Sequence, residues 1–580
     1  MKVVEMKVRS LHFFMAALLL AASAPAAEYF VARQGNDSNE GLSRAAAFAT
    51  VQKGVDALKP GDILTIAPGE YLGGVRREHL GTNATVTVIR AEIPGTAIIR
   101  GDIPVDGFRK ADGSRFAYVA DLACTGKVVA VNELDTLKVF DKMPNAAELD
   151  FIPGVFFHDQ AAGKLYISTS DMQPVENHRY TAAVIGTHGL YLKNPQRVVV
   201  EGLAVTGFNA GNELHYSWGT LGGVWGIFIL NGKSCVVRDC RAWLNGWGIG
   251  LNSGATNSGD NVIERCVAWA NRSKFWSGDM GGLTGFAVRR DVIRDSTSFL
   301  NGMYGVNIYG TGTDGGTYGD WQVPGNEPEN KSRLVNNLAW GNPSSDFKIK
   351  TGVKYFHTVE QGIGLGAWSV TSNNISDSIV GRGHGVPADS ILLPDNLDLA
   401  SEFADPLNHD YRLQATSRFR GAAPGGKNQG PFQYKECIYY VRPDGNDSAD
   451  GLSVSNAWRS LARAARGLKP GDTLYIARGN CGEWQDFSLK GEPRKPIRIK
   501  GRGRDLAVIP GRWLAGECAH VEFERICFLE DAKIKKAENV VFNNCQFQAK
   551  TTGLQVERAA GLRVTHCVFT GFRESGLMIG

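Results

Sequence analysis

The sequence lacks the patterns that mark several common classes of protein. Its 10 cysteines include no C-x-x-C pair, so no zinc site is expected. Charged residues make up 21% of the chain and the formal net charge is only +4, which gives no indication of a nucleic-acid or membrane-surface partner. Beyond the N-terminus no apolar run is long enough to span a bilayer. We therefore expect neither nucleic acid nor a membrane among the partners of the mature protein.

The N-terminus has the layout of a secretory signal peptide. Lys2, Lys7 and Arg9 form a basic region, residues 11–22 form an apolar core, and small residues up to Ala27 suit a peptidase. An uncleaved anchor is the alternative, but the apolar run is too short to cross a bilayer. We expect residues 1–27 to be removed, and the mature protein to be secreted or held in the periplasm or at the cell surface.

A long segment occurs twice in the chain. Residues 29–69 match residues 439–479 without a gap, at an offset of 410 (439 − 29). Each copy has an apolar strand, a turn-rich Gly-Asn-Asp-Ser loop and an amphipathic helical pattern that Lys-Pro-Gly-Asp ends. Such a helix can cover the open end of a solenoid. We predict a first domain over residues 28–434 and a second over residues 437–580. The second should be truncated, because the chain stops directly after a coil strand at Gly580.

A shorter repeat fills the middle of the first domain. Strands of alternating apolar residues open at Gly189, Gly226, Gly248, Gly285, Gly305 and Asp346. Most are followed by a second strand that ends in an aromatic residue, with asparagine two positions later, at Asn245, Asn271, Asn301 and Asn342. Equal positions in successive coils of a parallel sheet stack about 4.8 Å apart, so these asparagines can hydrogen-bond from coil to coil. The cysteines at repeated positions are expected to be small core residues.

This pattern predicts an all-β fold, a parallel β-helix solenoid with an N-terminal capping helix, in tandem with an incomplete second copy. It resembles the right-handed parallel β-helix superfamily that includes the pectate lyases. The resemblance rests on the Gly-Asn-Asp-Ser opening with its capping helix, and on His409-Asp-Tyr-Arg-Leu413 with Gly430-Pro-Phe-Gln-Tyr434, which is similar to the C-terminal closure of such proteins. It implies right-handed coils. The fold carries lyases, hydrolases, epimerases and adhesins, so it does not choose a reaction.

A narrower resemblance concerns one strand. Asp346-Phe-Lys-Ile349 is similar to the Gly-Phe-Lys-Leu strand of family 9 polysaccharide lyases, in which the lysine is the catalytic base. The resemblance implies the same role for Lys348. That family also holds Ca²⁺ with an Asp-Asp-Gly-x-Asp cluster, whereas the strands that open at Gly285 and Gly305 lack this cluster. A Ca²⁺ cofactor is therefore implied only by the resemblance, and no other cofactor is expected.

Strand alternation decides which side chains face outward from the coils. Outward positions at Gly250 and Ala287 are small and should leave room above one sheet. Asn252 lies beside this room. The side chains expected within about two coils of one another, roughly 10 Å, are Arg289, Asn307, Tyr309, Lys348 and Lys350.

This cluster suits an acidic polysaccharide. Arg289 can bind a uronate carboxylate through its planar guanidinium group. Lys348 lies among other cations, which lower the pKa of a lysine and allow it to act as a base. Tyr309 can protonate the leaving oxygen. We assign catalytic roles to these three residues, and substrate-binding roles to Asn252, Asn307 and Lys350. The alternative is that all of them are ordinary solvated residues on a solenoid face.

Tryptophan is concentrated in the same region, where nine of the 12 lie between residues 218 and 368. Trp243, Trp269 and Trp340 occupy a repeated position and should form a structural stack. Insertions at about 209–224, 270–284 and 310–333 should wall a cleft, because long loops are often functional. The tryptophans expected to serve as platforms for sugar rings are Trp218, Trp225, Trp276 and Trp321.

Three functions remain open. The leading hypothesis is a polysaccharide lyase that cleaves a uronate-containing glycan by β-elimination. The second is a glycoside hydrolase of the same fold, which would use two carboxylates of the insertions, such as Asp279 and Asp314. The third is a non-catalytic glycan-binding or surface protein. In each case the expected partner is a polysaccharide, an acidic one for the lyase, and the expected state is a monomer.

Overall fold

The structure is a computed structural model of the chain. It describes residues 26–122, 124, 126–209, 223–255, 257–272, 281–286, 289–302, 304–309, 317–318, 321–322, 332–340, 361–365, 369–372, 375–376, 379–381, 391–392, 399–405, 410–421, 428, 437–493, 495–503 and 506–580. The predicted signal peptide lies almost wholly outside this set. Among the described residues no helix is both long enough and apolar enough to cross a membrane.

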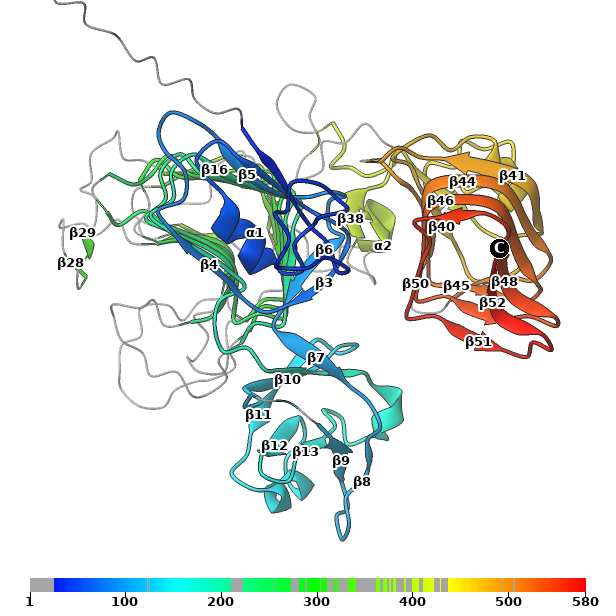
Figure 1. Cartoon of the computed structure of the whole chain (residues 1–580), viewed down its shortest axis with the longest axis horizontal. Coiled ribbons are helices and arrows are strands. Elements are labelled where there is room, and N and C mark those ends of the chain that lie inside the picture. Colours follow the sequence, from blue (N-terminus) through cyan, green and yellow to red (C-terminus); the bar gives the residue numbers. More distant parts are fainter. Residues whose placement is uncertain are drawn as a thin grey trace, which may run out of the picture.

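The first part of the molecule, residues 28–421, winds into coils that visit three parallel sheets in a fixed order, A, B, C (Figure 1). Sheet A contains β1 (Glu28–Val31), β2 (Ile63–Ile66), β5 (Thr87–Ala91), β16 (Val198–Glu201), β19 (Val236–Arg238), β22 (Val262–Glu264), β25 (Val292–Arg294), β30 (Ser332–Val335) and β33 (Ser369–Ser372). Sheet B contains β3 (Gly69–Leu72), β6 (Ala97–Arg100), β17 (Ala204–Thr206), β20 (Arg241–Trp243), β23 (Val267–Trp269), β26 (Thr297–Phe299), β31 (Leu338–Trp340), β34 (Ile375–Ser376) and β36 (Ile391–Leu392).

Sheet C is the third sheet of the coils. It contains β4 (Val75–Glu78), β15 (Leu190–Lys193), β18 (Trp225–Leu230), β21 (Trp247–Asn252), β24 (Gly281–Phe286), β27 (Tyr304–Tyr309), β32 (Gln361–Leu365) and β35 (Ile379–Gly381). Every pairing within the three sheets is parallel, and right-handed crossovers are the rule for parallel strands. The predicted fold class, a right-handed parallel β-helix, is confirmed.

Alternate residues of each strand fill the interior of the coils. In sheet C, Ile227, Ile249, Leu283 and Val306 lie in register on successive strands and are all fully buried. Burying one such side chain contributes about 1.5–3 kcal/mol. Because the strands are short, each coil contributes only a few of these residues, so the coils depend on one another for stability.

Side chains at the turns connect successive coils. The backbone N–H of Asn271 donates to Oδ1 of Asn301 at 3.1 Å, and that of Asn245 donates to Oδ1 of Asn271 at 3.2 Å. The predicted asparagine ladder is confirmed for these three residues, whereas Asn342 lies outside the described residues. The rings of Trp243 and Trp269 stack at 4.9 Å with an interplanar angle of 3°, as expected from their repeated position.

Helix α1 (Val51–Ala57) covers the first coil, as predicted. The hydroxyl of Thr50 accepts a hydrogen bond from the N–H of Lys53 and so caps the helix. Val51 and Val55 face the core. Gly54 permits close packing, because a Cβ there would lie 2.6 Å from the side chain of Val31.

An antiparallel subdomain, residues 102–183, interrupts the second coil between sheets B and C. It projects from the coils in Figure 1 and has its own apolar core around Phe140, Phe156 and Tyr180. The repeats did not predict it, because an antiparallel strand alternates apolar and polar residues just as a coil strand does. Its elements are β7 (Asp102–Val105), β8 (Arg109–Lys110), β9 (Ala117–Asp121), β10 (Ala130–Glu133), β11 (Lys138–Lys142), η1 (Ala146–Asp150), β12 (Val155–Asp159), β13 (Lys164–Ser168), η2 (Val175–Asn177) and β14 (Tyr180–Ala183).

The first part ends in a short closing unit. A hairpin, β28 (Thr317–Tyr318) and β29 (Trp321–Gln322), precedes it. Helix α2 (Leu399–Glu402) then leads into the antiparallel pair β37 (Phe403–Asp405) and β38 (Asp410–Leu413). Phe403 and Leu413 pack with Phe299 and Leu338, which belong to sheet B. This pair contains the segment that was expected to close the domain.

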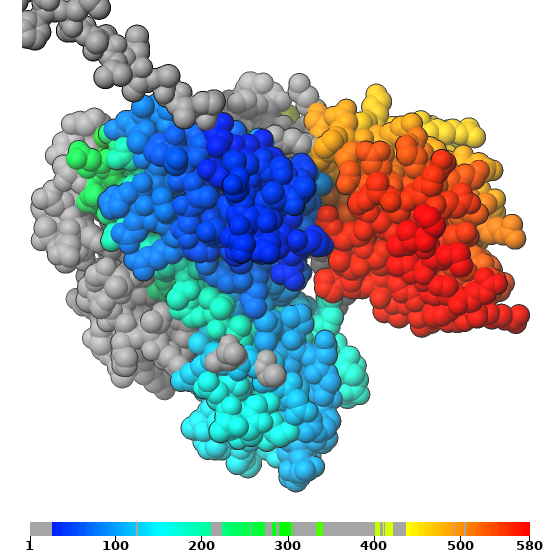
Figure 2. All heavy atoms as spheres, viewed as in Figure 1, coloured from blue at the N-terminus to red at the C-terminus, as the bar shows by residue number. Residues whose placement is uncertain are grey.

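The second part, residues 437–580, has a separate apolar core and lies beside the first part (Figures 1 and 2). One mostly parallel sheet contains β39 (Ile438–Val441), β40 (Thr473–Ile476), β41 (Trp484–Lys490), β42 (Ile497–Gly501), β44 (Trp513–Glu524), β46 (Ala532–Asn543), β48 (Thr552–Val556), β49 (Ala559–Ala560), β50 (Arg563–Thr565) and β52 (Ser575–Ile579). A second contains β43 (Ala507–Ile509), β45 (Ile526–Phe528), β47 (Gln546–Gln548) and β51 (Val568–Thr570), and helix α3 spans Leu461–Ala465. The predicted boundary near residues 434–437 falls mostly outside the described residues, and the tandem arrangement stays a prediction.

Candidate functional site

Long connections gather at one turn of the coil, the turn from sheet B to sheet C. The antiparallel subdomain joins β6 to β15 there, and the connections from β17 to β18, from β23 to β24 and from β31 to β32 use the same turn. Each of these connections ends where a sheet C strand begins. The outer face of sheet C therefore lies next to the edge of the solenoid at which these long connections occur. Long connections of this kind often carry function.

An aromatic stack covers the middle of this face. The ring of Trp225 lies 4.8 Å from that of Phe228 and 4.6 Å from that of Trp247, and both pairs are stacked. Trp225 is 1% exposed. Both faces of its ring are thus covered within the protein, which differs from the open sugar platform that the sequence suggested. The sequence placed Trp225 in an insertion, and that position could not reveal which rings it stacks on.

Gly250 explains how the stack can lie so close to the sheet. A Cβ at this position would be 2.2 Å from the Trp225 ring, so only glycine allows the indole to lie over β21. The expectation of open space above Gly250 is therefore wrong, because Trp225 fills it.

His188 extends the stack toward the first coils. Its ring stacks on Tyr191 at 5.0 Å, and its Nδ1 accepts a hydrogen bond from the backbone N–H of Trp225 at 3.0 Å. Because Nδ1 is an acceptor, the proton of the neutral ring lies on Nε2. Burial, assisted by the nearby Arg76, lowers the pKa of His188 to about 4, so the ring is neutral at physiological pH.

Charged side chains flank the stack at the first two coils. Arg76 on β4 is in register with Tyr191 on β15, and its guanidinium carbon lies 5.5 Å from the Tyr191 ring centroid. Glu78 pairs with Arg76 at 2.7 Å and with Lys193 at 3.4 Å. Sequence reasoning missed Arg76 and His188. The segment Gly74-Val75-Arg76 has the Gly-apolar-x pattern of the repeat and could have revealed Arg76 as its first copy.

The register of β24 corrects two expected positions. The strand spans Gly281–Phe286, so Thr284 lies beside Gly250 and Phe286 lies beside Asn252. Ala287 and Arg289 were expected at these two positions. The error arose because Gly282-Leu-Thr-Gly285 and Gly285-Phe-Ala-Val288 overlap, and both can be aligned with the repeat.

Arg289 and Asn252 belong to a buried polar cluster at the turn after sheet C. The N–H of Arg289 donates to Oδ2 of Asp291 at 3.3 Å, and Ser253 donates to the same oxygen at 2.5 Å. Asn252 is fully buried, and its Oδ1 accepts the N–H of Gly254. Burial raises the pKa of Asp291 to about 6, against the lowering effect of these donors. The cluster holds the turn together and keeps the Asn252 side chain away from solvent.

The remaining predicted residues fall in or beyond later coils. Asn307 and Tyr309 are part of β27, which belongs to sheet C, and Trp321 is part of β29. The strand that follows β27 in sheet C is β32, not the expected segment 346–349. The residues that lie outside the described part of the chain are Lys348, Lys350, Trp218 and Trp276.

No group of three or more His, Cys, Asp or Glu side chains among the described residues is arranged to hold a metal ion. The outward positions of β21 and β24 also lack the carboxylates that Ca²⁺ requires. The residues present in these coils do not fit the Ca²⁺ cluster implied by the family 9 resemblance.

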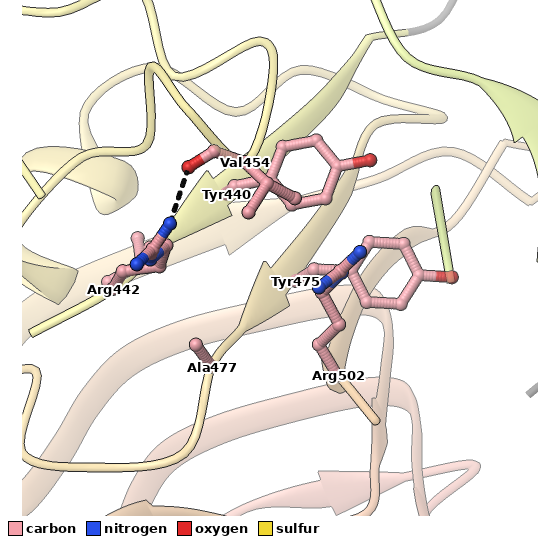
Figure 3. Close-up of a pocket in the computed structure, with 7 residues that line it drawn as sticks. Tyr440, Arg442, Val454, Tyr475, Ala477 and Arg502 are labelled. Carbon is pink, nitrogen blue, oxygen red and sulfur yellow. Dashed lines mark hydrogen bonds between the residues drawn. The ribbon is translucent and has the colours of Figure 1, made fainter. Parts of the chain in front are cut away.

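A crevice of about 270 Å³ lies in the second part, where Tyr440, Tyr475 and Arg502 line it (Figure 3). Its polar groups already have partners in the closing unit of the first part. The Tyr475 hydroxyl donates to Asp410, and Nε of Arg502 donates to the carbonyl of Ala404 at 3.0 Å. The crevice is therefore part of the contact between the two parts of the molecule, and sheet C remains the better candidate site.

In the comparisons with known proteins, the chain is similar to solved structures only. No family model and no curated protein matches the chain. It is similar to XylC in complex with xylose, at 9% identity and a TM-score of 0.39, over 90% of this chain and 76% of that one. It is similar to pectate lyase Pel9A, at 15% identity and a TM-score of 0.34, over 71% and 97% of the two chains. It is also similar to the A-module of the mannuronan C-5 epimerase AlgE4 of Azotobacter vinelandii, at 10% identity and a TM-score of 0.24, over 93% of each.

Proposed function

We propose that this protein is a carbohydrate-active enzyme that cleaves a uronate-containing polysaccharide by β-elimination on the outer face of sheet C. The observation that carries the proposal is the combination of cations and aromatic rings on adjacent strands of this face. Arg76 and Lys193 flank the half-buried ring of Tyr191. Aromatic surfaces suit sugar C–H groups, and cations suit carboxylates.

The chemistry of a lyase requires two further roles. A base must remove the proton next to the uronate carboxylate, and an acid must protonate the leaving oxygen. Lys348 is the proposed base, on the strength of its sequence motif, and Tyr309 on β27 is the proposed acid. Arg289 and Asn252 lie in the buried turn cluster, so their proposed contribution is to hold the end of β21 and β24 in place.

A panel of acidic and neutral polysaccharides tests the proposal. The full-length protein should release unsaturated, ultraviolet-absorbing products from a uronate polymer. Lys348→Ala should lower that rate about 10³-fold, within the usual contribution of a general base. The matched control is Lys536→Ala, a half-exposed lysine of the second part that pairs with Glu517. It should leave the rate unchanged.

Other outcomes of the same panel contradict the proposal. Saturated reducing ends from any substrate, with activity that survives Lys348→Ala, would show a glycoside hydrolase that uses other carboxylates. No turnover on any glycan would show a binding or surface protein. Assays with EDTA and with added Ca²⁺ decide whether a metal takes part, because loss on chelation and recovery with Ca²⁺ would require a site beyond the coils described above.

A further inference from the structure

We propose that the first two coils of sheet C form a subsite for one uronate carboxylate, built from Arg76, His188, Tyr191 and Lys193. This inference rests on the proposed function and places one substrate contact of that function at a defined position. None of the four residues has a catalytic or binding role predicted from the sequence. They come from β4, β15 and the turn just before β15.

Strand register brings the two cations to the same side of the sheet. β4 and β15 are neighbours, with Arg76 beside Tyr191 and Glu78 beside Lys193. Residues two apart on a strand face the same side, so all four side chains lie on the outer face. The Arg76 side chain is 68% exposed and that of Lys193 is 37% exposed, so both can reach a ligand.

Glu78 holds the two cations in place without neutralising both. It accepts a hydrogen bond from Nη2 of Arg76 at 2.7 Å, and it lies 3.4 Å from Nζ of Lys193. Two cations and one carboxylate leave a charge of +1 on this cluster. Nη1 and Nε of Arg76 remain available, and each can donate a charge-assisted hydrogen bond to a carboxylate oxygen.

His188 adds a neutral donor to the cluster. Because Nδ1 accepts the N–H of Trp225, the ring orientation and tautomer are fixed, with the proton on Nε2. Among the described residues Nε2 has no hydrogen-bond partner, and the His188 side chain is partly exposed. The adjoining Tyr191 ring is half-buried, with Arg76 on one side and Phe228 stacked at 5.9 Å. Its hydroxyl group is a further donor.

The balance of donors and acceptors selects the ligand. Arg76, Lys193, His188 and Tyr191 all present donors, and Glu78 is the single carboxylate among them. A neutral sugar hydroxyl needs both donors and acceptors, whereas a carboxylate accepts only. Tyr191 is the half-buried end of the aromatic stack, so its ring gives the neighbouring sugar unit an apolar surface beside the cations. The cluster thus matches an acidic unit at one end of a bound oligosaccharide.

The test measures binding separately from cleavage. The full-length Lys348→Ala protein is titrated calorimetrically with hexamers of galacturonate, glucuronate, mannuronate and guluronate, and with the methyl esters of the same hexamers. At least one acidic hexamer should bind, and its ester should bind about tenfold more weakly. Arg76→Gln and Lys193→Gln should each weaken the acidic hexamer about tenfold and leave the ester unchanged. His188→Gln should weaken it less than His188→Ala, because the amide keeps a donor.

Arg238→Gln is the matched control. Arg238 is an exposed arginine of sheet A that pairs with Glu201 at 2.9 Å, as Arg76 pairs with Glu78. It should leave the affinity unchanged, and thermal unfolding should show that every variant folds. The subsite is wrong if an acidic hexamer binds and Arg76→Gln and Lys193→Gln do not weaken it, or if the ester binds equally well. In those cases cleavage by the unmodified protein would leave the proposed function standing. If no hexamer binds and no uronate polymer is cleaved, both proposals fail.

Discussion

In both parts of the molecule a hydrogen bond at the same turn links one coil to the next, but the accepting atom differs. The turn before β20, β23 and β26 holds Cys240, Cys266 and Ser296, and the turn before β47 and β51 holds Cys545 and Cys567. In the first part, the hydroxyl of Ser296 accepts the N–H of Cys266 at 3.1 Å. In the second part, the sulfur of Cys567 accepts the N–H of Cys545 at 3.4 Å.

The turn requires a particular backbone conformation but tolerates different side chains. Each of these residues follows a position with positive φ, such as Arg265 at 51° and His566 at 51°. The backbone therefore sets the turn, and the following side chain needs only to be compact and to reach the N–H of the neighbouring coil. Oxygen and amide groups do this more strongly than sulfur, which is a weak acceptor. The first part, which adds the asparagine ladder, should hold its coils together more tightly.

The largest effect is expected at the centre of the asparagine ladder. Asn271→Ala removes the acceptor of two N–H groups of Asn245 and the donor to the carbonyl of Ala242. Each buried polar group left without a partner costs about 1–3 kcal/mol, so the free energy of unfolding of the first part should fall by about 4 kcal/mol. Urea unfolding measures it, with the exposed Asn83→Ala as control. A loss below about 1 kcal/mol would show that water replaces the amide.

The next effect depends on pH. The pKa of Asp291 is about 6 in the folded protein, against about 4 for an unfolded aspartate. The folded state therefore binds the proton more tightly. Its contribution to stability is fully present below about pH 4 and is lost as the pH rises through about 6.

Asp291→Asn removes this dependence, because an amide does not titrate in that range. The stability of the variant relative to the original protein should rise by about 3 kcal/mol between pH 4 and pH 7, which corresponds to a difference of about two pKa units. Urea unfolding at both pH values measures the change. Parallel pH profiles of the two proteins would contradict the burial of this carboxylate.

A smaller effect should be equal in the two parts. Asp62 accepts the N–H groups of Ala27 and Lys59, both at 2.8 Å, and Asp472 accepts those of Cys437 and Lys469, also both at 2.8 Å. In the unprocessed chain, Asp62→Ala and Asp472→Ala should each cost about 2 kcal/mol, since each leaves two partly buried N–H groups unpaired. Removal of residues 1–27 takes away the N–H of Ala27 and its share of the loss at Asp62. Hydrogen exchange at these amides measures each loss locally. A large loss in one part alone would show that the two capping blocks are not equivalent.

The smallest effect concerns the thiol. Cys567→Ala should lower the stability of the second part by about 1 kcal/mol, because it removes one weak hydrogen bond from the N–H of Cys545. Cys567→Ser should restore it, since a hydroxyl is the better acceptor, as Ser296 is in the first part. Chemical unfolding followed by tryptophan fluorescence provides the measurement. Equal stability of the alanine and serine variants would mean that packing alone matters at this turn.

The sequence predicted the features that repeat along the coils. The alternation of strands, the capping helix, the asparagine ladder and the Trp243–Trp269 stack all follow from equal residues at equal positions. It failed where one pattern permits two alignments. Because the glycine segments around Gly285 overlap, the sequence alignment placed Arg289 on the outer face, whereas β24 ends at Phe286.

The candidate site was harder to predict because its parts come from different coils. Arg76 and His188 are separated in sequence by the whole antiparallel subdomain, and only the pairing of β4 with β15 brings them together. The closed stack around Trp225 depends on the absence of a side chain at Gly250, 25 residues later (250 − 225). Residue types alone do not show such contacts, which depend on the register between strands.

The antiparallel subdomain leaves and rejoins the coil through a single stem. β7 pairs with β14, so that Asp102 lies opposite Ala183, and the N–H of Val184 donates to the carbonyl of Gly101 at 2.9 Å. The two points at which the subdomain joins the solenoid are therefore neighbours. For protein engineering, this makes residues 101 and 184 a natural graft point. A short linker there would restore an uninterrupted coil, and any foreign domain with adjacent termini can be accommodated in its place.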